Sequence, residues 1–259
     1  DYFKENNISE IPAYGPLPVS VPGCVDGWFE LHDRFGKITM QEVLYPAIKY
    51  AENGFPMTEL VAYYMGIADD NFYNYPNFKE TYYINESTPK KGEIFKNPDL
   101  ANTFKLIAKK GRKGFYEGKV AQTISDFIIE QGGFLSYDDL KNHTSDWIDP
   151  VSTNYRGYDV WELPPNGQGI AALQILNLLE KFDIKSMGFG SAEYIHHFTE
   201  AKKIAFADRA KYYADMDFNK IPVDYLISKE YADTRRSEIN PNRAARKVSA
   251  GEIENGDTI

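Results

Sequence analysis

Thr258 has the residue type and the setting for a specific kind of chemistry. It follows Gly256 and Asp257 in the last stretch of the chain. A threonine hydroxyl is a weak nucleophile that needs a base, and a cut before Thr258 would free an α-amine with a pKa near ~8 on the same residue. Gly256 would also allow the strained backbone that an internal acyl shift needs. By local pattern alone, however, a threonine in a polar tail is usually only that.

His196 and Glu200 have the i, i+4 spacing of metal ligands on one helix face. The order His-Glu-x-x-His of a zinc protease helix is absent, because His197 follows His196 directly. No other His or Cys lies close by in the sequence. The pattern therefore favours helix packing and a surface role, and we predict neither a metal site nor a cofactor.

Asp215, Asp217 and Asn219 occupy the first, third and fifth positions of a possible calcium loop. The sixth position requires Gly and the twelfth requires Glu, but Lys220 and Leu226 stand there. The sequence therefore excludes a calcium loop of this kind.

The stretch "PPNGQG" (residues 164–169) lies between an expected strand and an expected helix, where phosphate is often bound. It has neither the spacing of a dinucleotide fingerprint nor the lysine of a P-loop. We interpret it as a tight connection in which Gly167 and Gly169 let helix and strand approach closely. Cys24 is the single cysteine, and no histidine is obviously paired with it, so a catalytic thiol is not expected.

The composition describes a folded, acidic protein. The chain has 259 residues, of which 42% are hydrophobic and 15% aromatic, with a net charge of −9. An acidic surface repels phosphate backbones, so nucleic acid is not an expected partner. No run of apolar residues is long enough to span a membrane. The chain begins without Met, and we expect it to be a piece of a longer protein.

Helix signals recur along the chain. Thr39 and Glu42 form a capping box, Asn97 is a good N-cap before Pro98, and Gly111 is a good stop. We expect helices near 25–31, 39–53 with a kink at Pro46, 98–110, 120–131, 170–179, 191–213 and 225–231, and a helical turn after Ser136. Residues 69–96 are polar and rich in Tyr and Asn, which predicts a surface excursion. The best strand is "YRGYDVWEL" (155–163), and we expect its sheet partners to lie outside the chain.

Several long blocks closely resemble the large subunit of the gamma-glutamyltranspeptidase family. They cover residues 19–57, 97–143, 150–180 and 200–232, and include "VPGCVDGWFELHDRFGKITM" and "PPNGQGIAALQILNLLE". The resemblance implies an α+β fold, the Ntn-hydrolase αββα sandwich, of which this chain would be a helix-rich part with few strands. On this interpretation residues 1–259 are an incomplete single domain, the C-terminal part of the large subunit, ending at the processing junction.

The resemblance also implies a mechanism. The precursor would cut itself before a threonine, and Asp257–Thr258 matches that junction, with Thr258 as the nucleophile. It would transfer the γ-glutamyl group of glutathione or a related compound, through an acyl-enzyme, to water or to the amine of an amino acid or peptide. A processed large subunit should end at Asp257, so either this chain is uncleaved or the nucleophile follows Ile259; we favour Thr258.

Other expectations follow from the same resemblance. The small subunit of the same precursor would be the partner, and the arginine that binds the substrate carboxylate would lie before Asp1, so no substrate-binding residue is assigned here. Arg156 and Arg209 are expected to hold structure through ion pairs near Asp159 and Asp208. We expect the complete enzyme in the periplasm or outside the cell, and no activity from this chain alone. A glutaryl or cephalosporin acylase on the same scaffold and a catalytically inactive homologue remain alternatives.

Overall fold

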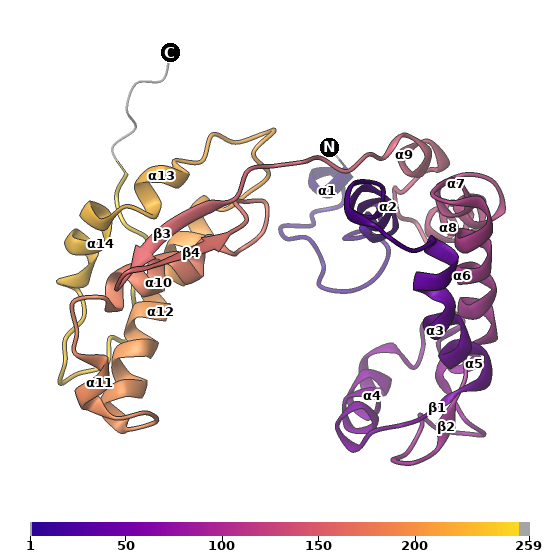
Figure 1. The fold of residues 1–259 in the computed structure, drawn as a ribbon, viewed down its shortest axis with the longest axis horizontal. Helices are drawn as coiled ribbons and strands as arrows, with labels where there is room; N and C mark the ends of the chain where they lie inside the picture. Colours follow the sequence, from indigo (N-terminus) through magenta and orange to yellow (C-terminus); the bar gives the residue numbers. More distant parts are fainter. Residues whose placement is uncertain (1, 254–259) are drawn as a thin grey trace. The chain divides into compact units, whose positions relative to one another are not determined.

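A computed structural model describes residues 2–253, and the chain divides into two compact units, residues 1–146 and 147–259 (Figure 1). The expectation of one incomplete domain concerns the complete enzyme and stays a prediction. No helix among the described residues is long and apolar enough to cross a membrane.

The first unit is almost entirely helical. Its elements are α1 (Tyr2–Glu5), α2 (Cys24–Phe35), α3 (Met40–Asn53), β1 (Phe55–Pro56), α4 (Glu59–Phe72), α5 (Phe78–Tyr82), β2 (Ile94–Phe95), α6 (Pro98–Lys110), α7 (Lys113–Tyr116), α8 (Lys119–Glu130) and α9 (Tyr137–Asn142). Helices α3 and α6 pack along each other, as Figure 1 shows. Nine buried apolar residues of the unit form one core: Val25, Met40, Leu44, Ile48, Ile107, Tyr116, Ala121, Leu135 and Leu140.

The predicted starts of α3 and α6 and the predicted end of α6 are confirmed, whereas α2 runs to Phe35, beyond the expected end near residue 31. Thr39 and Glu42 form the expected capping box, the side chain of Asn97 accepts the N–H of Leu100, and Gly111 caps α6 with a φ of 67°. Helix α3 continues through Pro46, and the kink expected there stays a prediction.

Residues 69–96 contain more regular structure than a surface excursion suggests. The end of α4 and all of α5 lie in this segment, and β2 closes it by pairing antiparallel with β1, with Phe55 opposite Phe95. Many of its tyrosines are nevertheless exposed, as expected for a surface segment.

A buried carboxylate fixes the start of α2. The Asp26 side chain accepts hydrogen bonds from Nε of Arg112 and from the backbone N–H of Ser145. Burial raises the pKa of this carboxyl. The hydrogen bonds and the positive charge of Arg112 lower it by a larger amount, so the net shift is downward. Cys24 begins the same helix and is exposed, while Nε2 of His32 lies 2.6 Å from the carbonyl oxygen of Ile38.

The second unit combines a hairpin with helices. Its elements are β3 (Val151–Tyr155), β4 (Tyr158–Glu162), α10 (Ile170–Leu179), α11 (Ile184–Met187), α12 (Ala192–Tyr212), α13 (Val223–Leu226) and α14 (Lys229–Arg236). Helix α10 contacts both strands as well as α12 and α14 (Figure 1). Seven of its ten residues are buried, which agrees with its mostly apolar sequence.

The expectation that the strand at 155–163 lacks a partner within the chain is wrong. It is two strands, because β3 pairs antiparallel with β4 and Tyr155 lies opposite Tyr158. Arg156 and Gly157, which connect the strands, have φ values of 53° and 91°. Two residues with positive φ form the tight turn that suits the twist of a hairpin. Arg-Gly is not the usual Asn-Gly signal for such a turn, so it was included in the predicted strand.

Two apolar clusters hold this unit together. One joins α10, α13 and α14 to the hairpin and contains Ile170, Leu173, Ile221, Leu226, Ile227 and Tyr231. The other joins α10 to α12 and contains Leu178, Leu179, Ala201, Ile204 and Ile239. The segment that follows α14 packs on both, through Val248 on the second cluster and Ile253 on the first.

Candidate functional site

The predicted nucleophile and junction, Thr258 and Asp257, lie outside the described residues. The structure does describe the segment that leads to them, residues 245–253. This segment lies along α12 and α14, and buried side chains of these helices contact its backbone at Ala245, Ser249 and Gly251. The candidate site is therefore the set of side chains that fix this segment.

Gly251 is held through both of its backbone polar groups. Its N–H donates to Oδ1 of Asp208 at 2.9 Å, and its carbonyl oxygen accepts the hydroxyl of Tyr212 at 2.5 Å. The glycine is buried, and an added Cβ would overlap the hydroxyl oxygen of Tyr231 and Nη1 of Arg235. No larger residue fits here without movement of these side chains, so the close approach itself requires glycine.

Asp208 is the centre of a fully buried polar cluster. Its side chain is 0% exposed, and its oxygens accept Nη1 of Arg235 at 2.7 Å and the hydroxyl of Tyr231 at 2.9 Å. Nε2 of Gln174 adds a further donor at 3.0 Å. With the N–H of Gly251, four donors surround one carboxylate. We call Asp208, Gln174, Tyr231 and Arg235 the Asp208 cluster.

Arg235 extends the cluster to a second point of the segment. Its Nη2 donates to the carbonyl oxygen of Ser249 at 2.7 Å, and its Nε donates to Oε1 of Glu238 at 2.6 Å. Burial lowers the pKa of this guanidinium. The charge of Asp208 and the contacts with Glu238 raise it by a larger amount, so the net shift is upward. Arg235 therefore remains a cation that matches the buried Asp208 anion.

Two tyrosines act as neutral hydrogen-bond donors: Tyr231 within the cluster and Tyr213 beside it. Burial, followed by the negative charge of Asp208, raises the pKa of Tyr231 above its usual value. The same two causes raise the pKa of Tyr213, whose hydroxyl donates to Oε1 of Gln174. Because both hydroxyls keep their protons at neutral pH, the cluster has a fixed pattern of donors and acceptors. Such a cluster holds geometry and has no spare group for acid-base chemistry.

Glu200 and Lys203 hold the beginning of the segment in the same way. Oε2 of Glu200 accepts the N–H of Ala245 at 3.0 Å, and Nζ of Lys203 donates to the carbonyl oxygen of Ala245 at 2.9 Å. Burial raises the pKa of Glu200, but the hydrogen bonds from Lys203 and Ala245 outweigh it, so the pKa is lowered overall. Both ends of residues 245–251 are thus fixed to α12.

The other residues singled out by sequence have structural partners. Nε2 of His196 lies 2.7 Å from the carbonyl oxygen of Asn240, and Nδ1 of His197 lies 2.9 Å from that of Glu193. Together with the contacts of Glu200, these bonds give the histidine region a packing role. Within residues 2–253, no group of three side chains is arranged to hold a metal ion.

Of the two glycines in "PPNGQG", one is required by a close approach. A Cβ on Gly169 would lie 2.6 Å from Oε2 of Glu162 and 3.0 Å from the carbonyl oxygen of Leu163, so this helix does start against the strand, as predicted. A Cβ on Gly167 would meet nothing within 4 Å, so the prediction is wrong for that residue.

Among the described residues, the side chains of the two arginines bind uncharged oxygen atoms and not the carboxylates expected for them. Arg156 donates to the carbonyl oxygens of Glu180 and Phe182, in line with a structural role. Arg209 donates to Gln168 at 2.7 Å, while its neighbour Asp208 pairs with Arg235. Sequence proximity was misleading here, because adjacent helix residues point in different directions.

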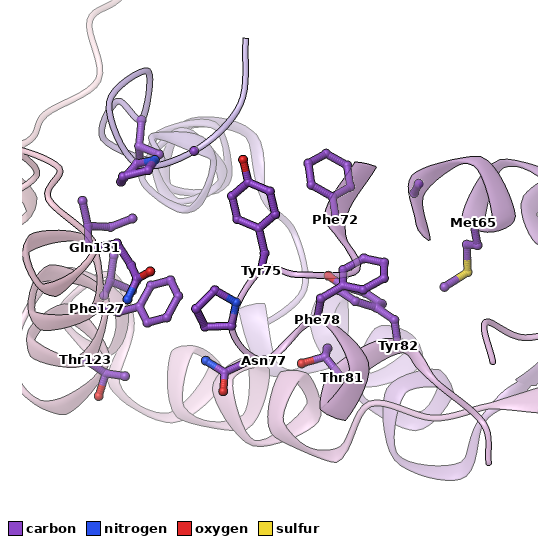
Figure 2. A pocket seen from close by; sticks show the side chains of 17 residues that line it. Met65, Phe72, Tyr75, Asn77, Phe78, Thr81, Tyr82, Thr123, Phe127 and Gln131 are labelled. Atoms are coloured by element: carbon purple, nitrogen blue, oxygen red, sulfur yellow. The ribbon is translucent and has the colours of Figure 1, made fainter. Parts of the chain in front are cut away.

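The first unit contains an apolar cavity of about 780 Å³, between the segment around α5 and helix α8 (Figure 2). Figure 2 shows Tyr75 and Phe78 on one side and Phe127 on the other. None of the described residues that line the cavity is charged. Such a lining does not suit a substrate with an α-carboxylate and an α-amine, which requires opposite charges.

Sequence reasoning did not identify the Asp208 cluster, although one signal was present. In the helix 192–212, the buried positions include Ala201, Ile204, Ala205 and Asp208, which follow the spacing of one helix face. An aspartate in register with an apolar stripe must find partners within the fold. Tyr231 and Arg235 are likewise i, i+4 on α14. Their meeting with Asp208 depends on helix packing, which no local pattern indicates.

The chain has clear relatives among known proteins. A sequence model of the family described as gamma-glutamyltranspeptidase matches residues 1–258. The chain belongs to this family, whose members are gamma-glutamyltranspeptidases and glutathione hydrolases, with acylases among their relatives.

Two solved structures are similar in sequence and fold. Helicobacter pylori gamma-glutamyltranspeptidase is 32% identical with a TM-score of 0.86, over 96% of this chain and 73% of that one. Cephalosporin acylase from Bacillus halodurans is 34% identical with a TM-score of 0.83, over 93% of this chain and 46% of that one. The fold class predicted from sequence, the helix-rich part of an Ntn hydrolase with few strands, is confirmed.

Among curated proteins, the glutathione hydrolase-like YwrD proenzyme of Bacillus subtilis (strain 168) is 38% identical over 89% of this chain. The acylase ACY 1 proenzyme of Pseudomonas sp. (strain SE83) is also 38% identical over 89% of the chain. This chain spans 44% and 41% of the length of these two proteins, so it matches less than half of each.

Proposed function

We propose that the chain is part of a self-processing enzyme that transfers γ-glutamyl groups through an N-terminal threonine, Thr258. The observation that carries this proposal is the family match, which extends to residue 258 and includes a threonine there. Relatives of this chain are named proenzymes, among them the glutathione hydrolase of Escherichia coli (strain K12), which is 35% identical. A proenzyme name fits a chain that must be cut before it acts.

In the proposed processing step, the hydroxyl oxygen of Thr258 attacks the carbonyl carbon of Asp257. The peptide C–N bond breaks and an ester forms, and the nitrogen of Thr258 takes the hydroxyl proton. Water then hydrolyses the ester, which leaves a carboxylate on Asp257 and a free α-amine on Thr258. That amine is the base that the hydroxyl needs for catalysis.

In the proposed turnover, the Thr258 hydroxyl attacks the γ-carbonyl carbon of glutathione or a related donor. The donor's amide C–N bond breaks, its amine leaves with a proton, and a γ-glutamyl ester remains on the oxygen. Water or the amine of an amino acid or peptide then breaks this ester. The charged groups of the substrate must be recognised by residues outside this chain, such as the arginine expected before Asp1 and the small subunit.

Replacement of Thr258 tests the proposal in the complete precursor. Thr258→Ala should abolish both the cut and the hydrolysis of a γ-glutamyl anilide, while Thr258→Ser should keep part of each, because it retains a hydroxyl. If Thr258→Ala still splits at the same bond, Thr258 is not the nucleophile. A cut directly after Ile259 would instead assign the nucleophile to the residue that follows Ile259.

A glutaryl acylase is the second candidate, because the acylase ACY 1 proenzyme is as similar as the YwrD proenzyme, at 38% identity. The two substrate classes differ in the α-amino group, which a glutaryl side chain lacks. Rates with a γ-glutamyl anilide and a glutaryl anilide on the processed enzyme separate them, and a clear preference for glutaryl would favour the acylase. Loss of all turnover in a correctly cut enzyme would favour the inactive homologue.

We also propose that the complete enzyme acts in the periplasm or outside the cell. The curated relatives reported above are bacterial, and the family resemblance leads us to expect export. Cell fractionation of a bacterium that expresses the complete precursor tests this; recovery of the processed enzyme in the cytoplasm alone would contradict it.

A further inference from the structure

We propose that the hold of the Asp208 cluster and Tyr212 on Gly251 places the Asp257–Thr258 bond for self-cleavage and is not needed once that bond is cut. This inference rests on the proposed function, since it assumes that the bond is cut. It assigns to contacts that lie far from Thr258 in the sequence a positioning role in maturation.

The segment before the proposed junction is held by its backbone atoms. Gly251 is buried, its N–H is bound to Asp208, and its carbonyl oxygen is bound to Tyr212. Arg235 binds the carbonyl oxygen of Ser249, two residues earlier, and Ile253 packs on an apolar cluster two residues later. Backbone contacts of this kind fix the path of the chain regardless of its side chains.

Only a short length of chain joins the fixed segment to Asp257. Asp257 is the fourth residue after Ile253, and an extended chain covers at most ~3.6 Å per residue. Four residues of chain can therefore span at most roughly 14 Å. If the Asp208 cluster released both Gly251 and Ser249, the next backbone anchor would be Ala245, twelve residues before Asp257. The longer tether would allow the bond many more positions, and intramolecular reactions slow sharply when the reacting atoms are misplaced.

The contacts of Gly251 restrict Thr258 only until the cut. While Asp257 is joined to Thr258, fixing Gly251 restricts both residues. After the cut, Gly251 belongs to the tail of the large subunit and Thr258 begins another chain. The contacts of Gly251 can then no longer position Thr258 through the backbone. A change that only weakens the fold would affect both stages, whereas a change that removes a contact with Gly251 and leaves the buried ion pair in place should affect only the first.

Two neighbouring tyrosines provide a matched test in the complete precursor. Tyr212→Phe removes the hydroxyl that binds Gly251, and Tyr213→Phe removes an adjacent hydroxyl that binds Gln174 and not the segment. Gly251→Ala adds a methyl group where Tyr231 and Arg235 leave no room. The appearance of the two subunits is followed over time by gel and mass spectrometry. The kcat and KM for a γ-glutamyl anilide are then measured per mole of cut enzyme.

We expect Tyr212→Phe and Gly251→Ala to slow the cut about tenfold or more, with kcat and KM of the cut enzyme unchanged, and Tyr213→Phe to be cut at the wild-type rate. Cutting of Tyr212→Phe at the wild-type rate would overturn the inference, as would a kcat that falls in parallel with the cutting rate. Thr258→Ala in the same series separates the two proposals. If it is cut normally, the proposed function fails, whatever the other variants show.

Discussion

Arg235 and Asp208 form an ion pair inside the second unit, with Nη1 at 2.7 Å from Oδ1 and side chains only 4% and 0% exposed. Each charge is also hydrogen-bonded to further partners, so neither is left uncompensated. A buried pair of this kind adds little stability over an apolar pair of the same shape, but removal of one partner leaves a bare charge.

We therefore predict that Arg235→Ala lowers the free energy of unfolding of the second unit by about 3–5 kcal/mol. The loss comes from the isolated Asp208 carboxylate. Urea unfolding of the precursor, followed by fluorescence, measures it. Lys181→Ala is the matched control, because its pair with Asp233 lies in the same unit and is solvent-exposed, and such pairs contribute roughly 0.2–1 kcal/mol. Equal losses in the two variants would contradict the burial argument.

The lowered pKa of Glu200 predicts a specific response to acid. Its ordinary value is 4.5, and in the folded state it is lower, so the folded protein binds fewer protons than the unfolded chain in this range. The contribution of Glu200 is fully present above the unfolded pKa, and it is lost as the pH falls through the lower folded pKa.

The difference in melting temperature between the wild type and Glu200→Gln should therefore be constant from pH 7 to about pH 5.5 and then shrink at lower pH. Differential scanning calorimetry at four or five pH values measures this. Glu86→Gln, at an exposed position, controls for the general effect of acid. A difference that grows as the pH falls would show that the pKa shift has the opposite sign.

The two glycines of "PPNGQG" allow a paired test of steric fit. Gly169→Ala should destabilise the second unit by about 1–3 kcal/mol, because the new methyl group would meet Glu162 and the backbone of Leu163. Gly167→Ala should change stability by less than about 0.5 kcal/mol, because no atom lies within 4 Å of its added Cβ. Urea unfolding of both variants gives the comparison, and a larger loss at Gly167 would contradict it.

The helix boundaries could be predicted because caps and stops are local. The capping box at Thr39 and the N-cap at Asn97 depend on residues within one turn, and both are confirmed. The hairpin was missed because its turn, Arg156-Gly157, lacks the usual residue types. The Asp208 cluster was missed for another reason: its members lie on three helices, and only tertiary packing brings them together.

The nucleophile, too, could not be identified from a local sequence pattern. Its assignment rests on the family resemblance, since a Gly-Asp-Thr sequence is too short to be specific. The family match to residue 258 supports that resemblance, but Thr258 itself lies outside the described residues. What the structure adds is the path of residues 245–253, which no sequence pattern predicted.

The last prediction concerns the chain by itself. Residues 1–259 should show no measurable hydrolysis of a γ-glutamyl anilide, because the chain spans only 40–44% of the glutathione hydrolases it matches and Thr258 has no free amine before the cut. The complete precursor should be active under the same conditions. Co-expression of the upstream part ending at Asp257 with a second chain that begins at Thr258 should restore turnover without any cut. The same pair with Thr258→Ala in the second chain should remain inactive. Robust turnover by residues 1–259 alone would contradict the assignment, because the charged groups of the substrate would then have to be recognised within this chain.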